Sequence, residues 1–320
     1  MSVVKNVSDI NKLAEEMKGF YSTLHSEFDV DEQWYSLDKN LNIGLPKEYK
    51  AQGILLPTAR SIVDTAVDHI SPQFRDITVP RKTATDAATN RAQNQSRFYG
   101  AALTWLELQA PSSPYRMSNK QLGIYGMSVT KTTYVEDWDV APGGKTAEEK
   151  EENAFIRSEY MPFSHKVLHP SEVFPDPFND EAQWVLQINS RMVGDVQAIY
   201  GTFNSEKGLT DKVEVIEFWD KKQRAVLVDG EAIVPLVEHE WGDHPYIIGD
   251  SGLGFIGKER RPEHRYMGYL RFLRELLASE SRNYSITDIV LKASGWPVRT
   301  ASGPGAAQLA GIKLDYGRIH

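Results

Sequence analysis

Apolar residues recur at helical spacing through the first 126 positions, and four helices are expected there. The first has Ser8 as its expected N-cap and carries its apolar residues on one face: Ile10, Leu13, Met17, Phe20 and Leu24. The limits of the other three follow from proline, glycine and capping residues: Pro57 to Pro72, Thr83 or Thr85 to about Gln109, and Ser112 or Ser113 to Gly126. The short segment 77–80 is expected to be a strand.

After residue 126 the apolar period changes to about two residues, which indicates strands. Five segments show this period: 127–138, 155–169, 182–190, 212–220 and 224–237. Asp229-Gly230 is a strong hairpin-turn sequence within the last of them. Residues 141–153, rich in Gly and Glu, are expected to form a solvated loop. Helices followed by antiparallel strands and a final helix predict an α+β fold.

The final helix is expected to span residues 258–293 without interruption. It would contain about thirty residues and be roughly 45 Å long at ~1.5 Å per residue. Such a length suits an assembly, or the lining of a channel, better than the closing of a small core. Its apolar residues recur at helical spacing: Met267, Leu270, Leu273, Leu277, Ile286 and Ile289. Its polar side is unusually basic: Lys258, Arg260, Arg261, Arg265, Arg271, Arg274 and Arg282.

Charge is distributed unevenly along the chain of 320 residues, whose formal net charge is −8. Residues 255–320 contain 11 Lys and Arg against 6 Asp and Glu, a charge of +5, which leaves −13 on residues 1–254. A general nucleic-acid binder is usually basic overall, so only a local and weak contact with a polyanion is expected. The chain has no cysteine, which excludes disulfides and thiolate metal sites. No apolar stretch is long enough to span a membrane, so no membrane partner is expected.

Gly252, Gly254 and Gly257 match the G-x-G-x-x-G pattern of a dinucleotide site. The apolar run before them is short and follows an antiparallel meander, whereas a dinucleotide site needs a βαβ unit. We therefore predict that Gly249, Gly252, Gly254 and Gly257 form a hinge before the long helix and bind no cofactor. A nucleotide-binding enzyme that uses the Gly252–Gly257 turn remains an alternative.

Two groups of His and Asp were weighed as metal ligands: His165, His169, Asp176 and Asp180, and His239, Asp243 and His244. Neither spacing matches a metal motif, and the prolines around the first group favour turn-forming roles for its aspartates. No nucleophile elbow, phosphate loop or H-E-x-x-H motif is present. The sequence therefore predicts no catalytic site, no metal and no cofactor.

The order of elements resembles that of tailed-bacteriophage portal proteins, the head-to-tail connectors. The resemblance covers most of residues 54–300 and is a pattern of elements with loose local similarity. It rests on LLPTARSIVDTAVDHI followed by ITVP, on the helix through NRAQNQSRFYGAALTWLELQ, and on NKQLGIYGMSVTKTTYV, LHPSEVFPDP and VEVIEFWDKKQRAVLVDGE. It continues through GFIGKERRPEHRYMGYLRFLRELLASESRNYSITDIVLKASGWP, which is similar to a stem helix leading into a clip.

The resemblance implies a wing over residues 1–257, helical to about 126 and antiparallel β over 127–257. It implies a stem helix over 258–293 and the start of a clip over 294–320, near Trp296 and Pro297. A return stem helix and a crown are expected after residue 320. The family forms a homo-oligomeric ring of about twelve copies at a capsid vertex. Double-stranded DNA passes through the ring during packaging and ejection.

The same resemblance implies further partners and a location. The terminase large subunit docks on the ring and head-tail adaptors later replace it, while the major capsid protein surrounds it. The protein is expected in the virion, and in the host cytoplasm during assembly. Within the stem, Arg265, Arg271, Arg274 and Arg282 are the candidates for DNA contact, with Arg271 and Arg274 on one face. A solvated face or a subunit contact remains the alternative for these arginines, and a virion or scaffold-binding protein without a DNA channel remains an alternative for the chain.

Overall fold

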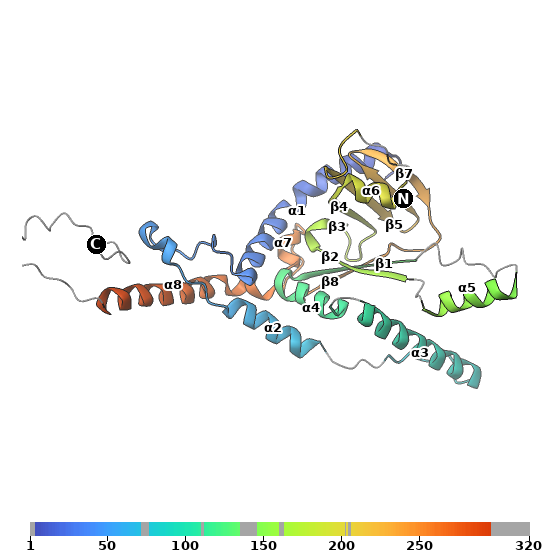
Figure 1. Ribbon diagram of the computed structural model, residues 1–320, viewed down its shortest axis with the longest axis horizontal. Helices are drawn as coiled ribbons and strands as arrows, with labels where there is room; N and C mark the ends of the chain where they lie inside the picture. The colour runs from blue at the N-terminus through green and yellow to red at the C-terminus, as the bar shows by residue number, and fades with distance from the viewer. Residues whose placement is uncertain are drawn as a thin grey trace, which may run out of the picture.

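The protein has an α+β fold, as the sequence predicts, with helices and two antiparallel sheets around a shared core (Figure 1). The computed structural model describes residues 4–71, 77–109, 112–134, 146–159, 163–201, 203 and 206–295. Within these ranges, no helix combines the length and the apolar character needed to cross a bilayer.

Four helices occupy the N-terminal part, close to where the sequence predicts them: α1 (Val7–Ser36), α2 (Thr58–Ile70), α3 (Asp86–Gln109) and α4 (Pro114–Tyr125). Ser113 caps α4, and Gly126 ends it in the left-handed conformation. The cap of α1 differs from the prediction: it is Asn6, which forms a capping box with Asp9, and Ser8 lies inside the first turn. A short 3₁₀ helix, η1 (Lys47–Gln52), lies between α1 and α2.

Two antiparallel sheets follow. In the first, the order is β2-β1-β8, with β1 at Met127–Tyr134, β2 at Phe163–Leu168 and β8 at Tyr246–Asp250. In the second, the order is β3-β4-β5-β6-β7, formed by Val173–Pro175, Trp184–Met192, Lys212–Asp220, Gln223–Val228 and Glu231–Glu238. The hairpin between β6 and β7 turns at Asp229-Gly230, both with positive φ, as the sequence predicts.

Shorter helices complete the fold: α5 (Ala147–Glu159), η3 (Pro170–Glu172), α6 (Val193–Ile199) and α7 (Pro262–Arg265). The final helix of the described chain is the long helix α8 (Tyr269–Gly295), which extends away from the body (Figure 1).

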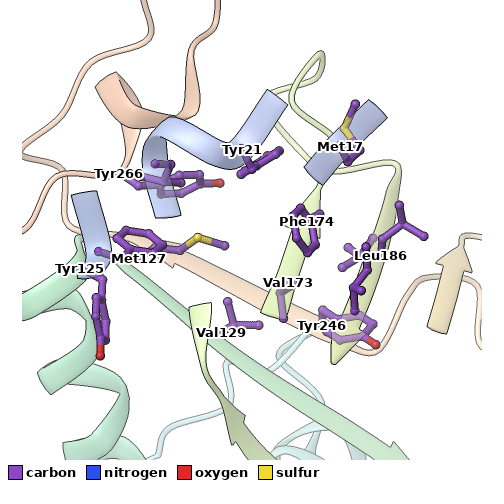
Figure 2. Packing of buried hydrophobic residues seen from close by; sticks show 14 of the residues in the cluster. Met17, Tyr21, Tyr125, Met127, Val129, Val173, Phe174, Leu186, Tyr246 and Tyr266 are labelled. Carbon is purple, nitrogen blue, oxygen red and sulfur yellow. The ribbon is translucent and has the colours of Figure 1, made fainter. Parts of the chain in front are cut away.

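Helix α1 lies at the centre of the core. Its residues Met17 and Tyr21 pack over Phe174 and Leu186 of the five-stranded sheet (Figure 2). The same cluster includes Tyr266, Leu270 and Leu277 of the C-terminal segment. A buried ion pair also joins the two sheets, because Lys131 Nζ of β1 lies 2.6 Å from a carboxylate oxygen of Glu217 on β5. The base of α8 therefore shares one core with the helices and sheets that precede it.

Four predictions differ from the structure. Residues 77–80 do not form a strand: the Val79 N–H donates to the Ser96 hydroxyl of α3 at 2.9 Å. Residues 147–153, predicted as loop, and 155–159, predicted as strand, belong to α5. There Thr146 and Glu149 form a capping box that favours helix over loop. The helix predicted over 258–293 is also interrupted, since α7 ends at Arg265 and α8 starts at Tyr269.

Candidate functional site: the junction of α8 with the body

The break between α7 and α8 lies where the chain crosses the end of α4. Gly268 passes so close to α4 that an added Cβ would lie 1.9 Å from the Ile124 carbonyl oxygen. Gly126 passes equally close to Met267, at 2.1 Å from its carbonyl carbon. No side chain larger than hydrogen fits at either position without moving backbone. This crossing of two backbones explains why a helical pattern is interrupted here despite favourable apolar spacing.

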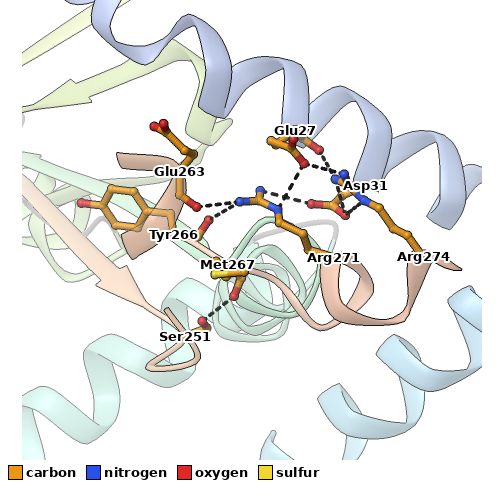
Figure 3. Close-up of polar contacts among 8 residues, drawn as sticks. All are labelled: Glu27, Asp31, Ser251, Glu263, Tyr266, Met267, Arg271 and Arg274. Carbon is orange, nitrogen blue, oxygen red and sulfur yellow. Dashed lines mark hydrogen bonds and ion pairs between the residues drawn. The ribbon is translucent and has the colours of Figure 1, made fainter. Parts of the chain in front are cut away.

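A second contact fixes the same break from the side of β8. The Ser251 hydroxyl donates to the Met267 carbonyl at 2.6 Å (Figure 3). The Ser251 N–H donates to the Gly126 carbonyl at 3.0 Å. The end of β8, the end of α4 and the start of α8 are therefore joined through one serine and two glycines.

Beyond the break, two arginines of α8 reach two carboxylates of α1 (Figure 3). Asp31 is completely buried, and its carboxylate lies 3.3 Å from Arg271 and 2.8 Å from Arg274. Glu27 also pairs with both arginines, and its backbone carbonyl accepts a 2.7 Å hydrogen bond from Arg274. Arg271 donates to the carbonyls of Glu263 and Tyr266 at 2.9 and 3.0 Å. We call these four charged residues the α1–α8 ion cluster.

Burial perturbs the titration of two members of the ion cluster, Asp31 and Arg271. Burial raises the pKa of the Asp31 carboxyl to about 6, while the two guanidiniums oppose this rise. Burial also lowers the pKa of Arg271, against the attraction of Asp31 and Glu27. The charged groups of the cluster pair with one another and join α8 to α1. The cluster is therefore a structural anchor for α8.

Further along α8, small buried residues hold the helix against the segment before α2. The Ser285 hydroxyl accepts from the Ile54 N–H at 2.9 Å, and the Ser281 hydroxyl accepts from the Leu56 N–H at 3.4 Å. The Arg282 guanidinium lies beside Gly44, where an added Cβ would be 2.8 Å from its terminal nitrogen.

These positions change the interpretation of the four arginines proposed to meet DNA. Arg271 and Arg274 do lie on one face, as predicted, but that face is turned to α1 and both side chains are engaged there. Arg265 precedes α8, lies 3.6 Å from Asp250 and packs over the Tyr266 ring. Arg271 and Arg274 are therefore contacts within the subunit, and Arg265 and Arg282 also lie against the body.

Sequence reasoning missed Glu27 and Asp31. The signal was available, because Asp31 follows Leu24 and Phe28 at i+7 and i+3 on the apolar face of α1. A carboxylate at a core position of an amphipathic helix requires a buried cationic partner. Gly268 was also missed, since nothing local distinguishes it from any other glycine.

The outward side of α8 carries four exposed apolar residues, with Ser279 and Asn283 between them, which the basic sequence of 258–282 does not suggest. Phe272, Leu276, Ile286 and Val290 are exposed, and Leu276 exposes 65% of its surface. At ~100° per residue these four positions fall within about 80° of arc. The buried positions Leu270, Leu277, Ser281 and Ser285 lie on the opposite side. We call the exposed set the α8 stripe.

The predicted glycine hinge is a set of close contacts in the structure. Gly249 lies within β8, opposite Ser128 of β1. At Gly254 an added Cβ would lie 2.0 Å from the Arg265 carbonyl oxygen, and the Phe255 N–H donates to the His264 carbonyl at 2.9 Å. Gly252 has φ +69° and forms a turn. Gly249 and Gly254 are thus packed against neighbouring atoms, whereas Gly252 has nothing within 4 Å of an added Cβ and Gly257 has only ordinary contacts, so a hinge in this segment stays a prediction.

The same contacts bear on the nucleotide-site alternative. The N–H groups of Gly252 and Leu253 donate to the side chains of Asp250 and Ser251, and that of Phe255 to a carbonyl. A pyrophosphate would need such N–H groups free, at the start of a helix. The helix that follows, α7, has only 4 residues. This turn therefore lacks the geometry of a phosphate cradle.

The two groups weighed as metal ligands are dispersed and satisfied by other partners. His165 contacts Thr132 at 2.8 Å and His169 contacts the Tyr125 hydroxyl at 3.0 Å, while Asp176 caps its own turn and Asp180 pairs with Arg260. His239 and His244 bond backbone carbonyls, and Asp243 accepts from the N–H of His244. In the described part of the chain, no three His, Asp or Glu are grouped to hold a metal. The predicted clip residues Trp296 and Pro297 lie outside the described residues.

Comparison of the chain with models of known protein families and with curated protein sequences finds no match. The functional argument therefore rests on the geometry of the junction and of α8.

Proposed function

We propose that this chain is the subunit of a portal-like ring, in which α8 is the stem and the body before it is the wing. The observation that carries the proposal is that α8 is apolar on two opposite sides. One side is covered by the core and by the segment before α2, whereas the α8 stripe is exposed. A row of exposed apolar side chains along one helix commonly marks an interaction surface, so the stripe calls for a partner.

A second copy of the same chain would cover the stripe in a ring. Each subunit would place its stripe against a different surface of the next subunit, which is a heterologous contact that closes under rotation. The anchored junction supports this arrangement. The Gly126–Gly268 crossing and the ion cluster fix the direction in which α8 leaves the body, and a closed ring needs one fixed angle in every copy.

The charge pattern of α8 refines the role proposed for DNA. Within α8, Arg271 and Arg274 are engaged by α1, Lys292 pairs with Asp288, and Glu275 and Glu280 are exposed. The fourth cation of α8, Arg282, lies beside Gly44. The stem thus offers passing DNA little free positive charge, so phosphate contacts would be weak and independent of sequence. Docking of the terminase large subunit, head-tail adaptors and major capsid protein, and residence in the virion, belong to the same proposal.

The shortage of free cations on α8 favours one other candidate: a ring-forming virion or scaffold-binding protein that has no DNA channel. Electron microscopy of the purified chain separates the two. The portal proposal expects a closed ring of about twelve subunits around an open axial channel wide enough for duplex DNA. A ring closed at its axis favours the second candidate, and particles without rotational symmetry contradict both.

A further inference from the structure

The segment from Ser251 to Arg265 presents an apolar tip that the stem and wing roles do not use. Leu253, Phe255 and Ile256 are consecutive apart from one glycine, and Phe255 and Ile256 expose 61% and 51% of their surface. Ile256 lines a small cavity together with Asp176 and Pro177, so the patch adjoins the segment after β3. Arg260, Arg261 and Lys258 form its rim. We call this surface the tip patch.

The tip is held rigidly although it is exposed. The Ser251 side chain bonds Met267, Gly254 packs on the carbonyls of His264 and Arg265, and the Phe255 ring stacks on His264 at 5.3 Å. Arg260 adopts a left-handed φ of 49°, which is unfavourable for a residue with a side chain, and its guanidinium is held by Asp180 at 2.9 Å. Preorganised apolar side chains bind a partner with little further loss of entropy.

We propose that the tip patch is a contact between copies, in which one subunit inserts Phe255 and Ile256 into the acidic body surface of the next. This inference rests on the proposed ring and names a second contact surface, apart from the α8 stripe. The distribution of charge along the chain favours a second copy as the partner of the tip patch. Residues 251–265 contain 4 Lys and Arg against 2 Glu, a charge of +2, so the rest of the chain carries −10.

An apolar tip with a cationic rim also suits the surface of an anionic membrane. A second copy and an anionic membrane differ in their electrostatic interaction with the acidic remainder of the chain. Residues 1–250, which carry a charge of −13, are attracted to the tip patch of a neighbour, whereas they are repelled by an anionic bilayer. The second copy is therefore the partner that the charge pattern favours.

The test replaces Phe255 with the photoreactive residue p-benzoylphenylalanine in the full chain, followed by irradiation. We expect covalent products between copies, and their digestion should map the partner to the acidic body. The matched control places the same group at Leu209, which is equally exposed but packs beside Gly194 on another loop. That position should give no products between copies.

A second measurement uses the double variant Phe255→Ser with Ile256→Ser. Because both side chains are mostly exposed, the chain should stay folded, with only the small loss of melting temperature that follows from removing the Phe255–His264 stack, while the concentration needed for assembly should rise at least tenfold. Normal assembly by this variant, without cross-links at Phe255, overturns the inference and leaves the ring intact. A parent chain that stays monomeric overturns both the inference and the ring. Binding to anionic phospholipid vesicles that the double variant loses, without cross-links, assigns the tip patch to a membrane instead.

Discussion

At the scale of single residues, Asp31 is the most consequential side chain at the junction. It lies on the apolar face of α1 and is completely buried, so its charge depends on Arg271 and Arg274 of α8. A buried ion pair adds little net stability compared with well-packed apolar residues, but removing one partner leaves a charge without compensation. The cluster therefore specifies where α8 docks more than it strengthens the fold.

Replacement of Arg271 by alanine should destabilise the chain by about 3 kcal/mol, because Asp31 and two backbone carbonyls lose a buried donor while Arg274 remains. The control is Arg261→Ala, which removes an exposed pair with Glu259 and should cost no more than about 1 kcal/mol. Urea unfolding of both variants measures the difference. Equal costs for the two substitutions would show that the cluster is not an anchor.

The raised pKa of Asp31 predicts a pH dependence. A carboxyl whose folded pKa is about 6 instead of 3.8 adds stability that is fully present below pH 3.8 and is lost as the pH rises through 6. Asp31→Asn removes this titration, so the melting temperature of the parent relative to the variant should fall between about pH 4 and pH 6 and level off above that. Parallel curves would rule out the titration, and a relative rise would mean that the arginines outweigh burial.

At the scale of elements, the junction is defined by a crossing of backbones. Some features depend only on residues close together in the sequence: the capping boxes, the limits of α4 at Ser113 and Gly126, and the turn at Asp229-Gly230. Sequence patterns can locate elements that such local features delimit. The interruption at residues 266–268 is not local. It exists because Gly126, about 140 positions earlier, occupies the path of the helix. Apolar spacing continued across the break and therefore predicted one helix.

The site was only partly predictable for the same reason. The pattern located the arginines and showed that Arg271 and Arg274 share a face, but a helical wheel does not reveal which element covers that face. The glycines of 249–257 were noticed as a group, whereas the carbonyls that Gly254 meets belong to His264 and Arg265, beyond the group. In both cases the contacts are made with residues outside the pattern that was recognised: Glu27 and Asp31 for the arginines, and His264 and Arg265 for Gly254.

Gly268→Ala should destabilise the chain by about 1–3 kcal/mol, since its Cβ meets the backbone of Ile124 and no side chain can move aside. Gly19→Ala is the matched control. It lies inside α1 with nothing within 4 Å of an added Cβ, and alanine should stabilise the helix by up to about 1 kcal/mol. Thermal unfolding compares the two variants. A neutral effect at Gly268 would mean that the α4–α8 crossing is looser than the structure shows.

At the scale of the whole molecule, the chain combines an acidic body with a firmly anchored helix whose outer side is apolar. Neither feature supports a catalytic role in the described part of the chain, and both suit a subunit that is completed by its neighbours. The α8 stripe and the tip patch lie on different elements, as two unlike contact surfaces in a ring require.

The central claim is that copies of this chain close into a ring through the α8 stripe. Native mass spectrometry of the purified chain tests it most directly, together with the variant Leu276→Glu with Val290→Glu, which places charges on exposed positions of the stripe. We expect one closed oligomer of about twelve subunits for the parent, and folded monomers with an unchanged melting temperature for the variant. A parent chain that remains monomeric at micromolar concentration, or a variant that assembles as the parent does, would contradict it.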